Sequence, residues 1–407
     1  MKLKNTFLIN ILLVLFCVVL IGCSSQTETT TSSNETVETV EKIQEENIDK
    51  GSVDIKITSV GDILLHGPII DAYKNDSYNF NNIFKYVKPY IESSNYSVAN
   101  MEGLTSDKDK YSGYPCFNAP TTILDSLKES GVDMLLGANN HRIDGGNAKY
   151  FDSLNEIEKR KFDFVGAKKT KEDKSYLVKD INGIKVGFIN YTFNTTKELG
   201  QPSLNGIPFS KEVDGLVDNF NQDNLDETKK VLKTSIDNVK KDGAEFIIFY
   251  PHWGAEYHIE PMDYQRNISQ FLCDEGVNLT IGGHPHVLEP IDTITSSSGD
   301  NKMVVLYSMG NFISNQRLET LNSYEGECGV IFNVTLNKDL NTNKVILKNY
   351  DYIPTWVRKY TNANSQTKFE IIPTIDIDKI SDLQNSEKER IKKADNLVRT
   401  RLELYKK

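Results

Sequence analysis

The placement of the histidines is the feature that most constrains this chain. Six short apolar runs each read as a buried β-strand and end in polar, glycine-containing residues: 53–60, 96–99, 132–136, 246–250, 277–281 and 303–307. Five of the six histidines follow such runs: His66, His141, His252, His284 and His286. Ligands of open α/β sheets gather at the carboxyl ends of strands, and neutral imidazole is the commonest protein metal ligand. The placement therefore predicts a metal site built from several strand-end loops.

The alternation of strands with amphipathic stretches predicts an α/β fold. Helical periodicity is found in stretches that precede several of the strands: 83–93, 121–130, 227–241 and 264–275. Asn182-Gly183 lies between two further apolar runs and is a hairpin signal. We therefore expect one domain over residues 53–378 that contains a mixed sheet.

The N-terminus reads as a targeting segment. Two lysines precede a long apolar run that ends in Gly22-Cys23, and a small residue directly before Cys is typical of lipoprotein signals. We expect residues 1–22 to be a lipoprotein signal peptide and Cys23 to carry the lipid; the alternative is a plain membrane anchor. Residues 23–52 are rich in Ser, Thr and Glu and predict a flexible tether. Both alternatives place the folded part outside the cytoplasmic membrane.

Charge and cysteine content restrict the partners and the redox chemistry. The formal net charge is −10, and because residues 1–22 hold two Lys and no acid, the mature part carries −12. This balance argues against a nucleic-acid partner. With Cys23 lipidated, three cysteines of the mature chain remain without CxxC spacing, so we expect no disulfide framework and buried thiols at Cys273 and Cys328.

Two further segments differ from the strand–helix alternation. Residues 195–225 read as a long polar loop, either a lid over the site or an idle surface insertion. Residues 379–407 read as a C-terminal helix docked on the domain, with Ser386 and Glu389 as a capping box. Its apolar stripe consists of Ile391, Ala394, Val398, Leu402 and Tyr405.

The most specific local pattern is Gly282-Gly283-His284-Pro285-His286. Two histidines at this spacing on a strand-end loop can face one cavity, because glycine lets the backbone approach closely and proline stiffens the turn between them. The alternative is a pair of surface histidines.

Asn139-Asn140-His141 and Asp144 follow another strand. An Asn oxygen can bind a metal, His141 can transfer a proton beside it, and Asp144 can hold the tautomer of His141. Alternatively, Asn and Asp cap the following helix.

His252-Trp253-Gly254 and Glu256 supply another imidazole, an aromatic wall and a carboxylate. Glu256 could be a ligand or an ordinary solvated acid, but a partner of His252 is the interpretation we favour.

Asp62, Asn100 and Glu102 provide hard oxygen atoms at two strand ends, and a carboxylate between two cations can bridge them. His66 could reach the same cavity as Asp62 or contact substrate, and Asn311 could orient a ligand or shape its turn. A set of His, Asn and carboxylate without thiolate favours two divalent ions such as Mn, Fe, Zn or Mg.

Taken together, these stretches resemble the capsule-synthesis protein A (CapA) family, which is associated with poly-γ-glutamate capsules and is itself similar to calcineurin-like metallophosphoesterases. The stretches that carry the resemblance occur in the order of the family and cover most of residues 53–320: 60–64, 100–102, 117–120, 138–146, 252–257, 281–287 and 307–312.

The resemblance implies a four-layer α/β/β/α sandwich with the site at one edge of its sheets. It also implies His141 as the acid that protonates a leaving group and a set of metal ligands: Asp62, Glu102, Asn140, His252, His284 and His286. The sequence departs from the phosphoesterase pattern at two places. In the Asp-x-His motif a histidine stands two residues after the aspartate, but here that position, after Asp62, is Leu64. Glu102 replaces a bridging Asp.

Two hypotheses of different class follow. The first is a lipid-anchored, metal-dependent hydrolase that acts on a phosphoester or a cell-surface polymer. The second is a non-catalytic scaffold that binds poly-γ-glutamate or membrane synthase subunits during capsule assembly or export.

Overall fold

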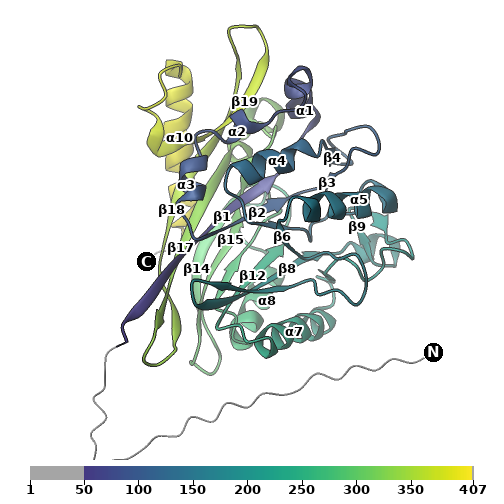
Figure 1. Ribbon diagram of the computed structural model, residues 1–407, viewed down its shortest axis with the longest axis vertical. Helices are drawn as coiled ribbons and strands as arrows, with labels where there is room; N and C mark the ends of the chain where they lie inside the picture. The colour runs from purple at the N-terminus through teal and green to yellow at the C-terminus, as the bar shows by residue number, and fades with distance from the viewer. Residues whose placement is uncertain (1–49, 406–407) are drawn as a thin grey trace, which may run out of the picture. The chain divides into compact units, whose positions relative to one another are not determined.

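The computed structural model describes residues 50–405 (Figure 1). The predicted signal peptide, Cys23 and nearly all of the predicted tether lie outside the described residues. Within the described part of the chain, no helix combines the length and the apolar character needed to cross a membrane.

The first sheet has a parallel half and an antiparallel half, in the order β19-β18-β17-β1-β2-β5-β6. The parallel strands are β1 (Ser52–Ile63), β2 (Tyr96–Met101), β5 (Met134–Leu136) and β6 (Asp163–Val165). The antiparallel strands are β17 (Cys328–Asp339), β18 (Val345–Thr361) and β19 (Thr367–Pro373). The short β16 (Asn311–Ile313) pairs in parallel with the end of β1.

The second sheet is also mixed, in the order β11-β8-β12-β13-β15-β14, with β7 paired to β8. Its strands are β7 (Leu177–Ile181), β8 (Ile184–Phe193), β11 (Asn219–Phe220), β12 (Phe246–His252), β13 (Leu279–Ile281), β14 (Leu288–Thr295) and β15 (Lys302–Met309). The predicted hairpin is confirmed, because β7 and β8 are antiparallel and both Asn182 and Gly183 have positive φ.

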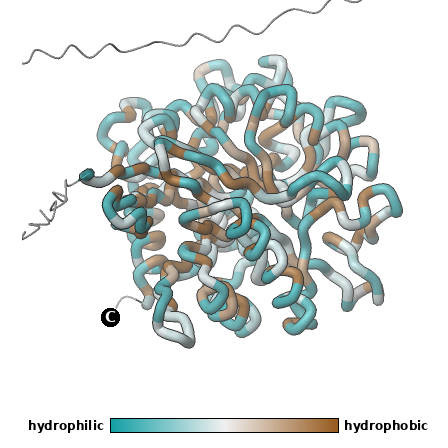
Figure 2. Tube along the Cα trace, turned by 60° about the horizontal axis from the view of Figure 1, so that its bottom comes forward, coloured by the Kyte–Doolittle hydropathy of each residue, from teal (hydrophilic) through white to brown (hydrophobic). Residues whose placement is uncertain are grey.

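The two sheets pack face to face, and helices cover their outer faces. Successive residues of one strand alternate between the layers: Ile248 and Tyr250 belong to the core between the sheets, whereas Ile247 and Phe249 pack outward. The helices over the first sheet are α1 (Gly67–Tyr73), α2 (Asn81–Phe84), α3 (Lys88–Glu92) and α4 (Thr122–Glu129). Those over the second are α7 (Leu225–Lys241) and α8 (Asp263–Asp274). The predicted four-layer α/β/β/α sandwich is confirmed, and Figure 2 shows its hydrophobic strands inside hydrophilic loops.

The remaining elements are short or lie at the margins of the sandwich. They are η1 (Lys74–Asp76), β3 (Leu104–Thr105), β4 (Asn118–Ala119), α5 (Gly146–Lys159), α9 (Leu318–Leu321), η2 (Glu325–Glu327) and η3 (Thr374–Asp376). The single helical stretch expected over 83–93 is wrong, because α2 ends at Phe84 and α3 begins at Lys88. Pro89 explains the break, since proline fits the first turn of a helix but not its interior.

The segment 195–225 is not the featureless loop that its composition predicts. It contains α6 (Thr196–Leu199) and a hairpin in which a two-residue turn joins β9 (Ser203–Leu204) to β10 (Ile207–Pro208). The edge strand β11 lies near its end. Leu204 is fully buried against Tyr150 of α5 and its neighbours, so the hairpin is anchored to the body of the domain.

The C-terminal helix α10 (Asn385–Leu402) closes one side of the sandwich, where it contacts β18 and β14. The predicted stripe is buried at Ile391, Ala394, Val398 and Leu402, which join the core between the sheets. The predicted capping box is wrong: the helix begins two residues earlier in register, and the Gln384 N–H donates to Glu387 Oε2 at 2.8 Å.

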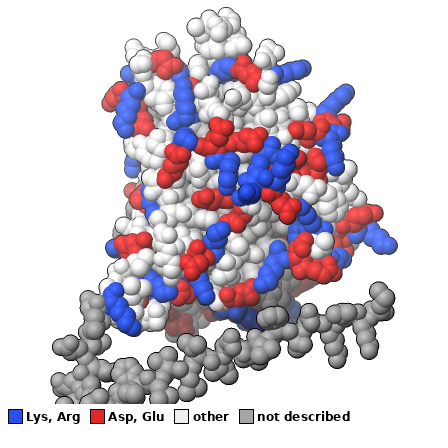
Figure 3. All heavy atoms as spheres, in the orientation of Figure 1, with Lys and Arg blue, Asp and Glu red and all other residues white. Residues whose placement is uncertain are grey.

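Surface charges of both signs are interspersed on the face shown in Figure 3. Many lysines and arginines of the described residues have acidic partners, among them the pairs Arg160–Asp125, Lys169–Glu158 and Lys174–Asp242. Cys273 and Cys328 are buried free thiols, as predicted, and Cys116 is exposed.

Candidate metal centre

The centre lies at the carboxyl ends of the parallel strands of both sheets. Asp62 and Asn100 are in register on β1 and β2, and Asn100 Nδ2 donates to Asp62 Oδ1 at 2.6 Å. Asp62 Oδ2 accepts the backbone N–H of His284 at 3.2 Å, which ties the first sheet to the second. Gly61 permits this approach, because a Cβ there would collide with the carbonyl oxygen of Gly310.

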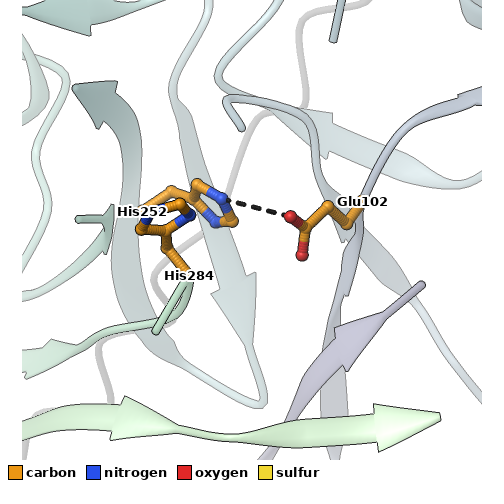
Figure 4. A group of neighbouring side chains, drawn as sticks. All are labelled: Glu102, His252 and His284. Atoms are coloured by element: carbon orange, nitrogen blue, oxygen red, sulfur yellow. Dashed lines mark ion pairs between the residues drawn. The ribbon is translucent and has the colours of Figure 1, made fainter. Parts of the chain in front are cut away.

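Glu102 follows β2 and lies between the two histidine groups. Its side chain is buried, and Oε1 is 3.6 Å from both His252 Nε2 and His286 Nε2 (Figure 4 shows the contact with His252). These distances are too long for hydrogen bonds. They are short enough for each imidazole to bind the same cation as the carboxylate. Glu102 is therefore the central member of the cluster.

The loop after β13 delivers two histidines through a strained backbone. His284 and His286 have φ values of 99° and 59°, a region that side-chain-bearing residues rarely adopt. Such strain is retained where the surrounding structure over-determines it, commonly at functional sites. His286 Nδ1 lies 3.2 Å from Asp62 Oδ2 and 3.1 Å from Asn311 Oδ1, so its ring orientation is set by two oxygens.

Five of the six predicted ligands form two triads that share Glu102. One triad is Glu102, His252 and His284, and the other is Asp62, Glu102 and His286; the candidate ligand atoms of each lie within 4.8 Å of one another. The sixth, Asn140, joins through His252, whose Nε2 is 2.8 Å from Asn140 Oδ1. Each triad could hold a cation, with Glu102 between the two.

The buried polar atoms of the cluster fit a cation. Both oxygens of Glu102, Asn100 Oδ1 and His284 Nδ1 are buried and have no hydrogen-bond partner among the described residues. An unpaired buried polar atom costs free energy, and natural proteins leave few of them without a functional reason. Divalent cations would satisfy carboxylate, amide and imidazole donors at once.

The electrostatics of the cluster point the same way. Burial would raise the pKa of Glu102, but the imidazoles of His286 and His252 outweigh it and hold the pKa well below its ordinary value. Burial would lower the pKa of His286, but the Glu102 and Asp62 carboxylates raise it to about 9. Burial and the neighbouring His252 lower the pKa of His284 well below its ordinary value. Positive charge is favoured next to Glu102, while His284 is kept neutral as a metal ligand must be.

His141 and Asp144 form the predicted dyad beside the cluster. His141 Nδ1 lies 2.6 Å from Asp144 Oδ2, which also accepts the backbone N–H of Phe117 at 2.7 Å. Because Asp144 can only accept, the proton of this contact resides on Nδ1, and Nε2 is left to exchange a proton with substrate.

Asn139 and Asn311 support the cluster from behind. Asn139 Nδ2 donates to the Met101 carbonyl at 3.0 Å, and its Oδ1 accepts the Gly103 N–H at 3.3 Å, so it brackets Glu102 in the chain. Asn311 Nδ2 donates to the backbone carbonyls of His286 and Gly326 and holds the loop of His286. Such outer contacts orient metal ligands.

The structure does not bring three predicted residues into the cluster. Trp253 is fully buried in the core under α8, and its Nε1 donates to the Tyr307 carbonyl, so it is not a wall of the pocket. Glu256 is exposed and lines the pocket mouth instead of pairing with His252. His66 also lines the pocket, where its Nδ1 contacts the Asn315 N–H at 3.3 Å, outside both triads.

A pocket of about 320 Å³ opens next to the cluster and contains His141 and His286 in its wall. Sequence reasoning missed most of its other lining residues: Leu64, Tyr114, Phe117, Asn205, Tyr257, Asn315, Gln316, Thr320 and Leu321. One signal was available, because Asn205-Gly206 is a hairpin dipeptide that places an amide at a fixed turn.

Comparison with known proteins decides the family. A sequence model described as bacterial capsule synthesis protein PGA_cap matches residues 56–316, which is more than half of the chain. The chain belongs to this family. Every residue of the two triads lies inside the matched range.

Two curated relatives come from Bacillus species. The chain is 27% identical over 321 residues to the capsule biosynthesis protein CapA of Bacillus anthracis, covering 77% of this chain and 70% of that protein. It is 29% identical over 262 residues to the PGA biosynthesis protein CapA of Bacillus subtilis (strain 168), covering 63% and 62% respectively. The chain thus spans less than three quarters of either relative.

Two solved phosphatase structures align more distantly. A novel phosphatase from Mycoplasma pneumoniae aligns with a TM-score of 0.41 and 17% identity, over 75% of this chain and 94% of that one. A purple acid phosphatase from yellow lupin aligns with a TM-score of 0.34 and 11% identity, over 79% and 54%.

Proposed function

We propose that this PGA_cap protein is a metal-dependent hydrolase of a phosphoester or polymer bond in capsule synthesis or export. The observation that carries the proposal is the buried Glu102 carboxylate: neither oxygen has a hydrogen-bond partner among the described residues, and Oε1 lies 3.6 Å from an Nε2 atom of both His252 and His286. A carboxylate in this position is built to be completed by cations.

The residues divide the work of hydrolysis between them. Bound divalent cations would supply Lewis-acid polarisation of the scissile group and neutralise the charge that develops on it. For a phosphoester, the bond from phosphorus to the water oxygen forms, and the bond to the leaving oxygen breaks. His141 gives the proton that the leaving oxygen takes up, and Asp144 holds the ring and stabilises its charged form.

The N-terminus and the relatives support the setting that we propose for the reaction. The Gly22-Cys23 signal supports an extracytoplasmic protein held to the membrane by lipid on Cys23. The curated relatives are named for biosynthesis of capsule and of PGA, which supports poly-γ-glutamate or membrane synthase subunits as partners.

A second function, a non-catalytic metal-binding scaffold of the same assembly, is favoured by one observation. Leu64 occupies the place of the histidine in an Asp-x-His pattern, and His66, the nearest alternative, contacts backbone atoms instead of either triad. A cation could then be held without full catalytic competence.

Metal analysis of the full chain, purified in detergent without chelator, tests the proposal. We expect bound divalent metal and hydrolysis of p-nitrophenyl phosphate or its diester that rises with added Mn²⁺. Glu102→Gln should lose both, whereas the exposed control Glu172→Gln should keep both. Bound metal without turnover of any phosphoester would favour the scaffold, and no bound metal after loading would contradict both functions.

Cell fractionation tests the membrane setting separately. Cys23→Ser should release the protein from the membrane fraction, because it removes the proposed site of lipid attachment. Unchanged membrane association would favour the plain anchor.

A further inference from the structure

We propose that the pocket beside the metal centre binds an uncharged, hydroxyl-rich ring, so that the substrate is a sugar phosphate ester. This inference rests on the proposed function and names the substrate class of the same site. It is carried by three features of the pocket wall: its charge, its aromatic side chains and its amides.

The charge of the wall disfavours a polyanion. None of the described residues that line the pocket is Lys or Arg, and Glu256 lies in the lining. The nearby cation Lys359 approaches from outside the lining, where its Nζ contacts Asn315 Oδ1 at 3.3 Å. Sites that grip carboxylates or phosphates along a chain use Arg and Lys forks. Poly-γ-glutamate, with one carboxylate per residue, would meet Glu256 in a lining that holds no Lys or Arg.

The aromatic side chains offer exposed ring faces. Tyr114 and Tyr257 are 76% and 43% exposed, although both line the pocket. Aromatic side chains that line a pocket offer large apolar faces to a ligand. Rings of sugars present C–H faces that pack on aromatic rings, so two tyrosines at one mouth suit such a ligand.

Tyr257 is held in place by the loop that carries His284 and His286. Its N–H donates to the Pro285 carbonyl at 2.8 Å, between the two metal-site histidines, and its hydroxyl accepts Gln316 Nε2 at 3.1 Å. Its φ is 64°, which is an outlier for a bulky residue. Backbone strain of this kind is common at functional sites, and here it positions the Tyr257 ring beside the metal centre.

The amides supply neutral hydrogen bonding. Asn205, Asn315 and Gln316 line the pocket, and an amide carries both donor and acceptor atoms, which matches hydroxyl groups. The Gln316 amide is bonded to Asn311 and Tyr257, and Asn315 Oδ1 accepts from Lys359, so Asn205 is the amide best placed for a ligand. Asn205 sits at the turn of the β9–β10 hairpin, with φ of 49°, and its Nδ2 lies 3.4 Å from His141 Nδ1. The segment 195–225 thus places an amide next to the proton donor.

The pocket wall and the cations would bind different parts of the substrate. The cations would take the single phosphoryl group, and the uncharged wall would take the sugar attached to it. A site of this kind discriminates by the groups it leaves unpaired, so a ligand without hydroxyls or with extra carboxylates binds less well.

Calorimetry with the Mn²⁺-loaded full chain tests the inference, with three probes: inorganic phosphate, N-acetylglucosamine 1-phosphate and tetra-γ-glutamate. We expect the sugar phosphate to bind at least tenfold more tightly than phosphate, and tetra-γ-glutamate to bind more weakly than the sugar phosphate. Tyr257→Ala should remove the advantage of the sugar without changing metal content, and Tyr257→Phe should restore it. Asn205→Ala is the second variant, and the exposed Ile346→Ala on β18 is the control that keeps wild-type binding.

Each result decides the question. Equal affinity for phosphate and sugar phosphate, tighter binding of tetra-γ-glutamate, or no binding of any probe would overturn the inference. Selective sugar phosphate binding without metal-dependent turnover would contradict the proposed hydrolase but leave the binding assignment standing.

Discussion

Two buried glutamates of this protein stand in opposite situations. Glu327, next to β17, is fully buried, and its oxygens accept from the Trp356 indole at 2.8 Å, from the Leu318 N–H at 2.7 Å and from Arg390 of α10. Glu102 is equally buried, yet neither of its oxygens has a hydrogen-bond partner in the described chain. The first is completed by protein groups and the second is not.

The difference separates a structural charge from a functional one. A buried ion pair whose geometry is satisfied joins elements, and here it ties the C-terminal helix to β17 and β18. A buried carboxylate surrounded by imidazoles without hydrogen bonds is stable only in company of positive charge. Burial alone does not distinguish the two, but the count of satisfied atoms does.

The largest effect is expected at Glu327. Glu327→Gln leaves Arg390 and Arg317 without their buried countercharge, so we expect the free energy of unfolding to fall by about 3–5 kcal/mol. Urea unfolding of the metal-free protein measures it. Metal content of the folded fraction should stay unchanged, and a loss below about 1 kcal/mol would remove the contrast with Glu102.

The two sites should also differ in pH dependence. Glu327 is bonded to guanidinium groups, which stay charged, and to an indole, which stays neutral, across this pH range. Glu102 instead relies on the charge of His286, whose pKa in the folded protein is raised to about 9. The stability from His286 is complete below its unfolded pKa of about 6.5 and is lost as the pH rises through 9, at most about 3 kcal/mol. Unfolding of the metal-free protein from pH 6 to 9.5 measures it.

Two controls make that pH prediction specific. Burial raises the pKa of Glu289 to about 8, so its ionisation destabilises the protein in the same window, and the experiment belongs in a Glu289→Gln background. Bound metal takes the place of the His286 proton, so loading should flatten the slope. A slope that persists with metal bound would contradict the role of His286.

Glu102→Gln should affect metal binding strongly and stability little, the reverse of Glu327→Gln. We expect metal binding to weaken by more than about 100-fold, beyond the effect of losing an outer contact. At pH 9.5, where His286 has largely lost its proton, stability of the metal-free protein should change by less than about 1 kcal/mol, because no hydrogen bond to Glu102 is lost. Metal titration and unfolding of the same preparation measure both, and retained metal affinity would exclude Glu102 as the shared ligand.

The smallest effect is expected outside the cluster, at Asp144. Asp144→Asn can donate to His141 Nδ1 and so favours the wrong tautomer, which should lower kcat by about 10- to 100-fold while metal content stays unchanged. Metal analysis and kinetics on one phosphoester substrate measure it. A loss of metal would place Asp144 among the groups that build the centre, and unchanged kcat would remove the dyad from the mechanism.

Much of the centre could be predicted from local sequence because strand ends are local features. His252, His284 and Glu102 each lie within three residues of the end of an apolar run, so the rule that parallel strands end at one edge predicts their placement within each sheet. The meeting of the two edges depends on how the sheets pack. The substrate pocket could not be predicted in the same way. Tyr114 and Gln316 come from loops with ordinary composition, and only their meeting in space gives them a role.

The sequence by itself determined the alternation of strands and helices, the hairpin at Asn182-Gly183 and the gathering of candidate metal ligands at strand ends, because these depend on short-range periodicity and turn chemistry. The tertiary structure alone decided which buried charges are satisfied, that Trp253 belongs to the core, and that α10 completes the core between the sheets. The physical reason is that hydrogen bonds and burial are properties of pairs far apart in the chain. Asp62 and His284, 222 residues apart, meet only when both sheets are packed.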